Sequence, residues 1–171
     1  MNYKTITPDL VFESLAQVDI ETLKNRGIRC AFLDLDNTVA CWKSRYVRFE
    51  ARKWAQAAKE AGINLYIVTN STKPRADEVA ARLGAGCFKD VRKPGTRRLR
   101  IIMRQVGTDT SHCVMIGDQL FTDVLAARRL GMLSVLVSPL SRKEWWATKV
   151  FNRTRERLVW KKVFPMDKRT R

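Results

Sequence analysis

The 171-residue sequence has no apolar run approaching the roughly 18 residues that cross a bilayer. Its first ten residues contain Lys4, Pro8 and Asp9 but lack the apolar core of a secretory signal. No internal repeat and no low-complexity linker divides the chain. These absences predict a single cytoplasmic domain without a transmembrane segment, and they leave the oligomeric state open.

Cysteine and histidine are scarce. The four cysteines (30, 41, 87 and 113) form no CxxC pair, so neither a zinc site nor a disulfide framework is indicated. A reducing compartment fits this usage. The only histidine, His112, is expected in a strand near the edge of a sheet, and we assign no function to it or to any cysteine.

Acidic residues are outnumbered, 17 against 33 Lys and Arg, which gives a formal charge of +16. Residues 142–171 alone contain eleven basic and three acidic side chains. Such an excess favours a polyanionic partner, either an anionic membrane face or RNA. The alternative is a solvated basic tail. A helix expected from Arg142 has an apolar stripe that either docks on the sheet or lies on a membrane: Trp146, Val150, Phe151, Thr154 and Leu158.

Short apolar runs alternate with segments of helical periodicity, which is typical of a doubly wound (Rossmann-like) α/β fold. About five parallel strands are expected, with helices on both faces. The strands are predicted at 28–33, 64–68, near 87–88, at 112–116 and at 133–137, and the helices at 8–24, 48–61, 74–83, 94–106 and 120–130. The connections leave no room for a sizeable cap domain. We expect one domain over residues 1–159 and a basic tail over 160–171.

Polar and acidic residues follow three of these apolar runs directly. They are Asp34-Leu35-Asp36-Asn37-Thr38, Thr69-Asn70-Ser71 and Gly117-Asp118-Gln119. Parallel strands deliver such groups to one edge of a sheet, at their carboxyl ends. Lys93-Pro94 stands between the second and third segments. The spacing therefore predicts one site built from several strands.

The residue types in this site suit phosphoryl transfer through an aspartate. Asp34 is the predicted nucleophile, because a carboxylate that attacks phosphorus divides one hard hydrolysis into two easier steps. Asp36 would point to the same side if the strand continued unbent, where it would protonate the leaving oxygen and then activate water. The alternative reading of an Asp-x-Asp-x-Thr string is a turn followed by a helix cap.

Three further positions complete the predicted site. Thr69 offers a hydroxyl to a phosphoryl oxygen, or else caps the following helix. Lys93 screens both the nucleophile and the phosphoryl group. Asp118 joins Asp34 and Asp36 in an acidic cluster that predicts bound Mg²⁺, although Mn²⁺ suits the same ligands. Asp123 is expected to orient a metal-bound water or Lys93 rather than to bind the metal.

With these motifs in order, the chain resembles the haloacid dehalogenase (HAD) superfamily of aspartate-nucleophile phosphatases. More narrowly, it is similar to the subclass IIIA, YqeG-like phosphatases. One departure is Thr69-Asn70-Ser71, where the subfamily usually has Ser-Asn-Asn. The similarity runs from Pro8 to about Val159 and rests also on Trp42, Arg75, Arg92-Lys93-Pro94, the segment 117–127 and the segment 151–157.

That family includes the mitochondrial phosphatidylglycerophosphate phosphatases, so the resemblance implies this lipid as substrate. An uncapped site and a basic surface agree with a membrane-held substrate, and place the enzyme at the inner face of the membrane. Asn70, Arg75 and Arg92 are the expected substrate-binding residues. The alternatives are a nucleotide, a sugar phosphate or an RNA end as substrate, although no aromatic stacking platform for RNA is recognisable. A non-catalytic basic scaffold that binds membrane or ribosome is a third possibility.

Overall fold

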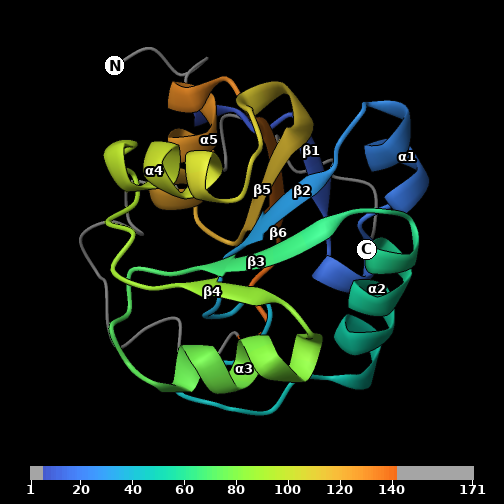
Figure 1. Cartoon of the computed structure of the whole chain (residues 1–171). Coiled ribbons are helices and arrows are strands. Elements are labelled where there is room, and N and C mark those ends of the chain that lie inside the picture. Colours follow the sequence, from blue (N-terminus) through green and yellow to red (C-terminus); the bar gives the residue numbers. More distant parts are fainter. Residues whose placement is uncertain (1–5, 142–171) are drawn as a thin grey trace, which may run out of the picture.

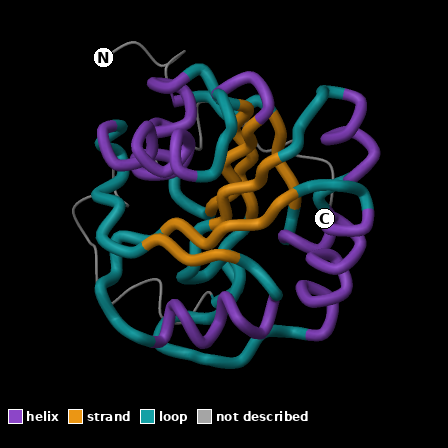
Figure 2. Tube along the Cα trace, viewed as in Figure 1, coloured by secondary structure: helices purple, strands orange, loops and turns teal. Residues whose placement is uncertain are grey.

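The computed structural model describes residues 6–141 and places a parallel sheet at the centre of the molecule, with helices around it (Figures 1 and 2). The strands are β1 (Leu10–Phe12), β2 (Cys30–Leu33), β3 (Asn64–Val68), β4 (Gly86–Phe88), β5 (Cys113–Gly117) and β6 (Leu133–Val137). The helices are α1 (Ile20–Asn25), α2 (Phe49–Glu60), α3 (Arg75–Leu83), α4 (Arg97–Gln105) and α5 (Leu125–Leu130). Short turns η2 (Leu15–Gln17), η3 (Thr110–His112) and η4 (Leu120–Val124) complete the described part.

The strand order is β1-β6-β5-β2-β3-β4, and every pair is parallel. The chain therefore runs outward from β2 through β3 to β4 and then returns to place β5 on the other side of β2. Such a reversal opens a crevice at the carboxyl ends of the two strands. The register aligns Leu33 of β2 with Ile116 of β5, so the residues that follow these two positions lie side by side.

Two apolar layers cover the sheet, because alternate strand residues point to opposite faces. Ala31 and Leu33 pack with the buried faces of α2 and α3, whereas Cys30 and Phe32 pack with those of α4 and α5. All four β2 residues are buried, as expected for a central strand of a parallel sheet. A parallel sheet with helices on both faces confirms the doubly wound α/β prediction. Within residues 6–141, no cap domain is inserted between these elements.

The predicted helix over 8–24 is wrong, and the sheet has six strands rather than about five. Residues 10–12 form β1, which pairs with β6, and α1 starts only at Ile20. Asp19 fixes that start, because its carboxylate accepts a hydrogen bond from the Thr22 N–H. The exposed edge of β6 offers main-chain partners to residues 10–12, and this pairing outweighs their helical spacing.

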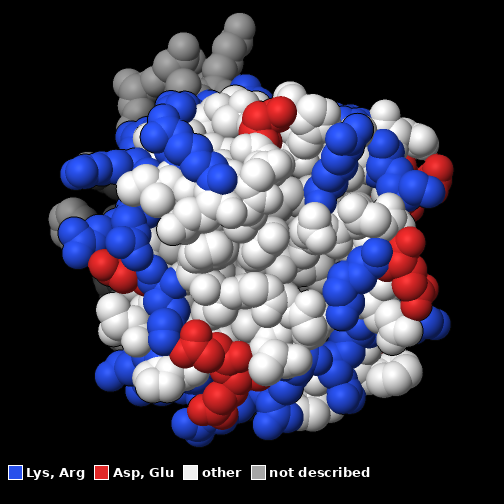
Figure 3. Space-filling model, viewed as in Figure 1, with Lys and Arg blue, Asp and Glu red and all other residues white. Residues whose placement is uncertain are grey.

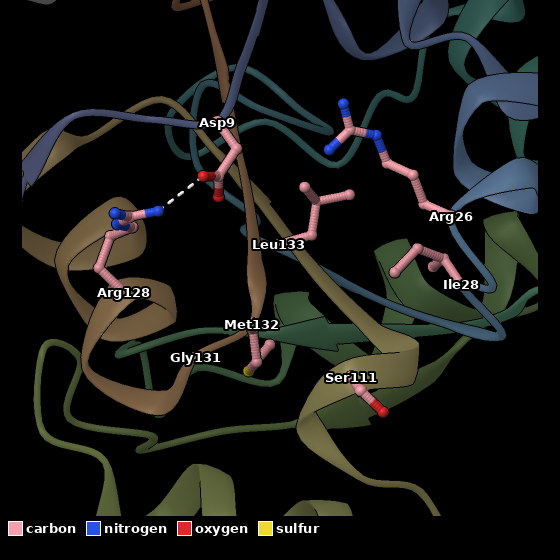
Figure 4. A pocket seen from close by; sticks show the side chains of 8 residues that line it. All are labelled: Asp9, Arg26, Ile28, Ser111, Arg128, Gly131, Met132 and Leu133. Carbon is pink, nitrogen blue, oxygen red and sulfur yellow. Dashed lines mark hydrogen bonds and ion pairs between the residues drawn. The ribbon is translucent and has the colours of Figure 1, made fainter.

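Asp9 anchors β1 to β6 beside a cavity of about 460 Å³ (Figure 4). Its carboxylate accepts hydrogen bonds from the Ser134 N–H at 2.9 Å and hydroxyl at 2.7 Å, and from Arg128 at 2.6 Å. The cavity is lined by residues that precede β1, β2, β5 and β6 or begin β6. It therefore lies at the amino-terminal edge of the sheet, away from the predicted site.

Asp9→Ala is expected to lower the free energy of unfolding by about 1–2 kcal/mol, because the buried Ser134 N–H loses its charged acceptor. Denaturant unfolding measures the change. Arg128→Gln removes only one of the three donors to the Asp9 carboxylate and leaves the Ser134 N–H bonded, so it should cost less. A stability loss for Arg128→Gln equal to that of Asp9→Ala would contradict this assignment.

Three local features differ from the sequence prediction. The helix predicted from Pro94 begins at Arg97, because Pro94 and Gly95 form a turn in which the Gly95 N–H binds the Arg92 carbonyl. The helix predicted over 120–130 opens with the π-helical turn η4. His112 lies in η3, just before β5, rather than in a strand.

The predicted helix from Arg142, its apolar stripe and the tail over 160–171 lie outside the described residues. Within 6–141, none of the helices has the length and apolar character that crossing a bilayer requires.

Candidate active site

The carboxyl ends of β2, β3 and β5 bring three of the four predicted segments to one edge of the sheet. Asp34 follows β2 directly, and its N–H binds the Ile116 carbonyl of β5 at 2.9 Å. Thr69 follows β3 and Asp118 follows β5. All three are buried, with exposed fractions of 8% or less. Buried polar side chains at this edge are the arrangement that the sequence predicts.

Lys93 connects two of the carboxylates. Its Nζ lies 2.6 Å from an oxygen of Asp34 and 2.7 Å from an oxygen of Asp123. Burial alone would lower the pKa of Lys93, but Asp123 and Asp34 together raise the pKa above its ordinary value. The ammonium group is therefore held protonated between two anions.

The loop that carries Lys93 is fixed by Asn70. The Asn70 side chain accepts a hydrogen bond from the Lys93 N–H at 2.6 Å and donates one to the Lys93 carbonyl at 2.9 Å. Both main-chain groups of Lys93 are thus bound by one amide side chain. Asn70 is predicted from the sequence to bind substrate. Its contact with Lys93 has no local sequence signal, because 23 residues separate the two partners.

Asp123 reaches the site because the turn η4 returns it to the end of β5. Its carboxylate accepts a hydrogen bond from the Gln119 N–H and lies against the Cα of Gly117. A Cβ at position 117 would come within 3.0 Å of the Asp123 Cβ and Cγ. Burial raises the pKa of Asp123 to about 6, with Lys93 lowering it and Asp34 raising it. Glycine at position 117 is therefore required by close packing, a role the sequence analysis did not assign.

Gly117→Ala should destabilise the protein by about 1–3 kcal/mol and reduce turnover, because the added methyl group displaces the Asp123 carboxylate. Thermal unfolding and the kcat for p-nitrophenyl phosphate measure the two effects. A variant as stable and as active as the natural protein would show that Asp123 does not depend on this contact.

Asp34, Asp118 and Asp123 form a buried acidic cluster in which each offers a carboxylate oxygen within 4.8 Å of the others. Lys93 pairs with two members of this cluster, Asp34 and Asp123. Clustered carboxylate oxygens are the donor set that hard divalent cations prefer. The residues present therefore fit a divalent metal.

Asp36 takes a different direction from the one predicted for an unbent strand. The strand ends at Leu33, and Asn37 has a left-handed backbone with φ of 62°, so the chain turns here. The Asp36 carboxylate forms an ion pair with Arg75. Burial raises the pKa of Asp36, with Arg75 lowering it and Asp34 raising it.

The remaining predicted residues have defined contacts. The Thr69 hydroxyl accepts a hydrogen bond from the Ser71 N–H at 3.1 Å. Arg75 donates to the Ser44 carbonyl at 2.7 Å as well as to Asp36, so it ties α3 to the segment after β2. Arg92 is exposed and pairs with Asp90. Arg75 thus lies beside the acidic residues, whereas Arg92 faces solvent.

Comparisons with known proteins agree with this geometry. The family model for haloacid dehalogenase-like hydrolases matches residues 6–131. The probable phosphatase YqeG of Bacillus subtilis is 32% identical over 156 residues, which are 91% of this chain and 90% of the relative. Phosphatidylglycerophosphate phosphatase 1 of Arabidopsis thaliana is 26% identical over 81% of this chain. The match spans only 42% of that relative.

Solved structures share the fold. The 3-deoxy-D-manno-octulosonate 8-phosphate phosphatase of Moraxella catarrhalis, solved with magnesium, phosphate and sugar, has a TM-score of 0.51 at 18% identity, over 73% of this chain and 87% of that one. The cobalt-bound deoxy-D-mannose-octulosonate 8-phosphate phosphatase of Haemophilus influenzae has a TM-score of 0.53 at 14% identity, over 81% of this chain and 90% of that one. The family match, the YqeG relative and the acidic site together establish that this chain belongs to the haloacid dehalogenase-like hydrolases and is a phosphatase.

Proposed function

We propose that the protein hydrolyses a phosphomonoester through a phosphoryl group carried on Asp34, with Mg²⁺ as its metal. The observation that supports this most directly is the Lys93 ammonium group, 2.6 Å from Asp34 and 2.7 Å from Asp123 at the carboxyl edge of the sheet. This cation is paired with Asp34 and would stabilise the charge that the phosphoryl group develops in the transition state.

In the first step a carboxylate oxygen of Asp34 forms a bond to phosphorus, and the bond from phosphorus to the ester oxygen breaks. Asp36 gives its proton to the departing oxygen. In the second step water loses a proton to Asp36 and attacks phosphorus, which breaks the bond to Asp34 and releases phosphate. Both residues then return to their starting states. Burial raises the pKa of Asp36 and Arg75 lowers it, and in this cycle the carboxyl group would alternate between donating and accepting the proton.

The metal is proposed to be held by Asp34 and Asp118 together with the main-chain carbonyl of Asp36. A divalent cation there would neutralise charge on the phosphoryl oxygens and orient them for in-line attack. Asp123 is proposed to position Lys93, because its carboxylate already binds that ammonium group and the Gln119 N–H. Thr69 contributes its hydroxyl to a phosphoryl oxygen. The proposed substrate-binding residues remain Asn70, Arg75 and Arg92. Asn70 would act indirectly, by holding the loop that carries Lys93.

The proposed substrate is phosphatidylglycerophosphate, an anionic lipid met at the inner face of a membrane. The name of the Arabidopsis relative supports it, as do the absence of a cap domain from residues 6–141 and the formal charge of +16. The alternative is a soluble phosphomonoester, either a sugar phosphate, as the names of the structural neighbours suggest, or a nucleotide or RNA end. A substrate anchored in a bilayer needs an open site, which favours the lipid.

Phosphate release from phosphatidylglycerophosphate in mixed micelles tests the proposal, with Mg²⁺ and with EDTA. Asp34→Asn should abolish release, and Asp109→Asn, an exposed carboxylate at the opposite edge of the sheet, should not. Turnover of p-nitrophenyl phosphate and of 3-deoxy-D-manno-octulosonate 8-phosphate is measured in parallel. Asp34-dependent cleavage of these soluble substrates without lipid cleavage would overturn the lipid assignment and retain the phosphatase. Inactivity on all three would favour a scaffold.

A further inference from the structure

Helix α4 presents a row of arginines to solvent. Its buried face consists of Leu99, Ile102 and Met103, which pack on the sheet. The opposite face follows the helical spacing i, i+3, i+4 and i+7. It contains Arg97, Arg100, Ile101 and Arg104, all exposed.

No acidic residue accompanies these arginines on α4. Among the described residues, no carboxylate forms an ion pair with Arg97, Arg100 or Arg104. Figure 3 shows Lys and Arg side chains gathered on the side of the molecule where α4 lies in Figure 1. The positive charge of this face is therefore available to an external anion.

Ile101 adds an apolar centre to the arginine face. It is one of the large apolar side chains that stay exposed, at 43%. A hollow of about 460 Å³ adjoins it, lined by Asp90, Val91, Arg92, Gly95, Arg97, Arg98 and Ile101. Cationic groups around an apolar side chain match an interface in which anionic headgroups overlie acyl chains.

The same hollow borders the loop that completes the active site. Lys93 points inward, with 2% of its side chain exposed, whereas the Arg92 side chain is 77% exposed. Arg129 of α5 donates to the Pro94 carbonyl and supports this loop from the other side. Arg92, which lines this hollow, is thus adjacent in the chain to the residue whose side chain contacts Asp34.

We propose that the exposed face of α4, made of Arg97, Arg100, Ile101 and Arg104, docks the enzyme on an anionic lipid bilayer. The guanidinium groups bind headgroup phosphates in the geometry that suits arginine, and Ile101 enters the layer beneath them. A single-stranded RNA would require aromatic side chains for stacking, and α4 has none. Helix α4 would thus hold the proposed lipid phosphatase at the bilayer that contains its substrate. The proposal rests on that function only for its biological purpose.

Vesicle flotation tests the docking surface without any turnover, so its result is independent of the substrate assignment. The full chain is mixed with phosphatidylcholine vesicles that contain about one third phosphatidylglycerol. The test variant is the triple substitution Arg97→Gln, Arg100→Gln and Arg104→Gln. The control is Arg48→Gln, Arg52→Gln and Lys53→Gln, which removes equal charge around α2, on the other face of the sheet. Both variants retain residues 142–171.

The α4 variant should bind these vesicles at least about tenfold more weakly than the control, because each basic residue near such a surface contributes a factor of about five. Ile101→Ser should also weaken binding. Vesicles of pure phosphatidylcholine should bind neither the natural protein nor any of these variants. Thermal unfolding verifies that both variants are folded. Equal binding by the α4 and α2 variants would overturn the proposal. Loss of binding to a single-stranded RNA oligonucleotide, with vesicle binding unchanged, would assign the face to RNA instead.

Discussion

Asp34→Asn is expected to lower kcat for p-nitrophenyl phosphate by about 10⁴-fold or more, because an amide oxygen does not form the bond to phosphorus that starts the reaction. The residue is buried at the end of a central strand, where its N–H is bound by Ile116 and its carboxylate by Lys93. The substitution keeps the shape of the side chain, so the fold should persist.

Near-ultraviolet circular dichroism and a thermal melt of Asp34→Asn verify that persistence. Asp109→Asn serves as the matched control, because it removes an exposed carboxylate at the amino-terminal edge of the sheet. A folded Asp34→Asn protein that retains a tenth of the natural rate would rule out Asp34 as the nucleophile.

Lys93→Met is expected to lower the free energy of unfolding by about 3–5 kcal/mol, because it leaves buried carboxylates without their cation. It should also remove most of the activity. Denaturant unfolding in EDTA measures the stability change free of any metal contribution.

A second substitution separates charge from packing. In the Lys93→Met background, Asp123→Asn removes one of the two anions that Lys93 contacts and should restore part of the lost stability. The activity should not return, because Asp34 still lacks its ammonium partner. If the two single effects simply added in the double variant, Lys93 and Asp123 would not be coupled through their charges.

Most of the site could be predicted from the sequence because its residues directly follow buried strands. The apolar runs before Asp34, Thr69 and Asp118 predict parallel strands, and parallel strands end at the same edge. The register of Leu33 with Ile116 then places the first and last of these segments side by side. Local pattern and tertiary position therefore agree in this part of the chain.

Other features depend on contacts between distant residues and leave no local pattern. Strand β1 exists because residues 10–12 pair with β6, about 125 positions later in the chain. The direction of Asp36 follows from the left-handed turn at Asn37 and the partner that Arg75 provides. Asn70 binds Lys93 only because β3 and the loop 91–95 meet in space. Pairings of this kind are fixed by the assembled fold.

The central claim is that Asp34 carries the phosphoryl group during turnover. Rapid acid quenching after mixing with a ³²P-labelled phosphomonoester, followed by peptide mass spectrometry, tests it most directly. The mechanism predicts label on the peptide that contains Asp34, sensitive to hydroxylamine and absent from Asp34→Asn. Label on another carboxylate, or full turnover with none on the protein at any quench time, would contradict it.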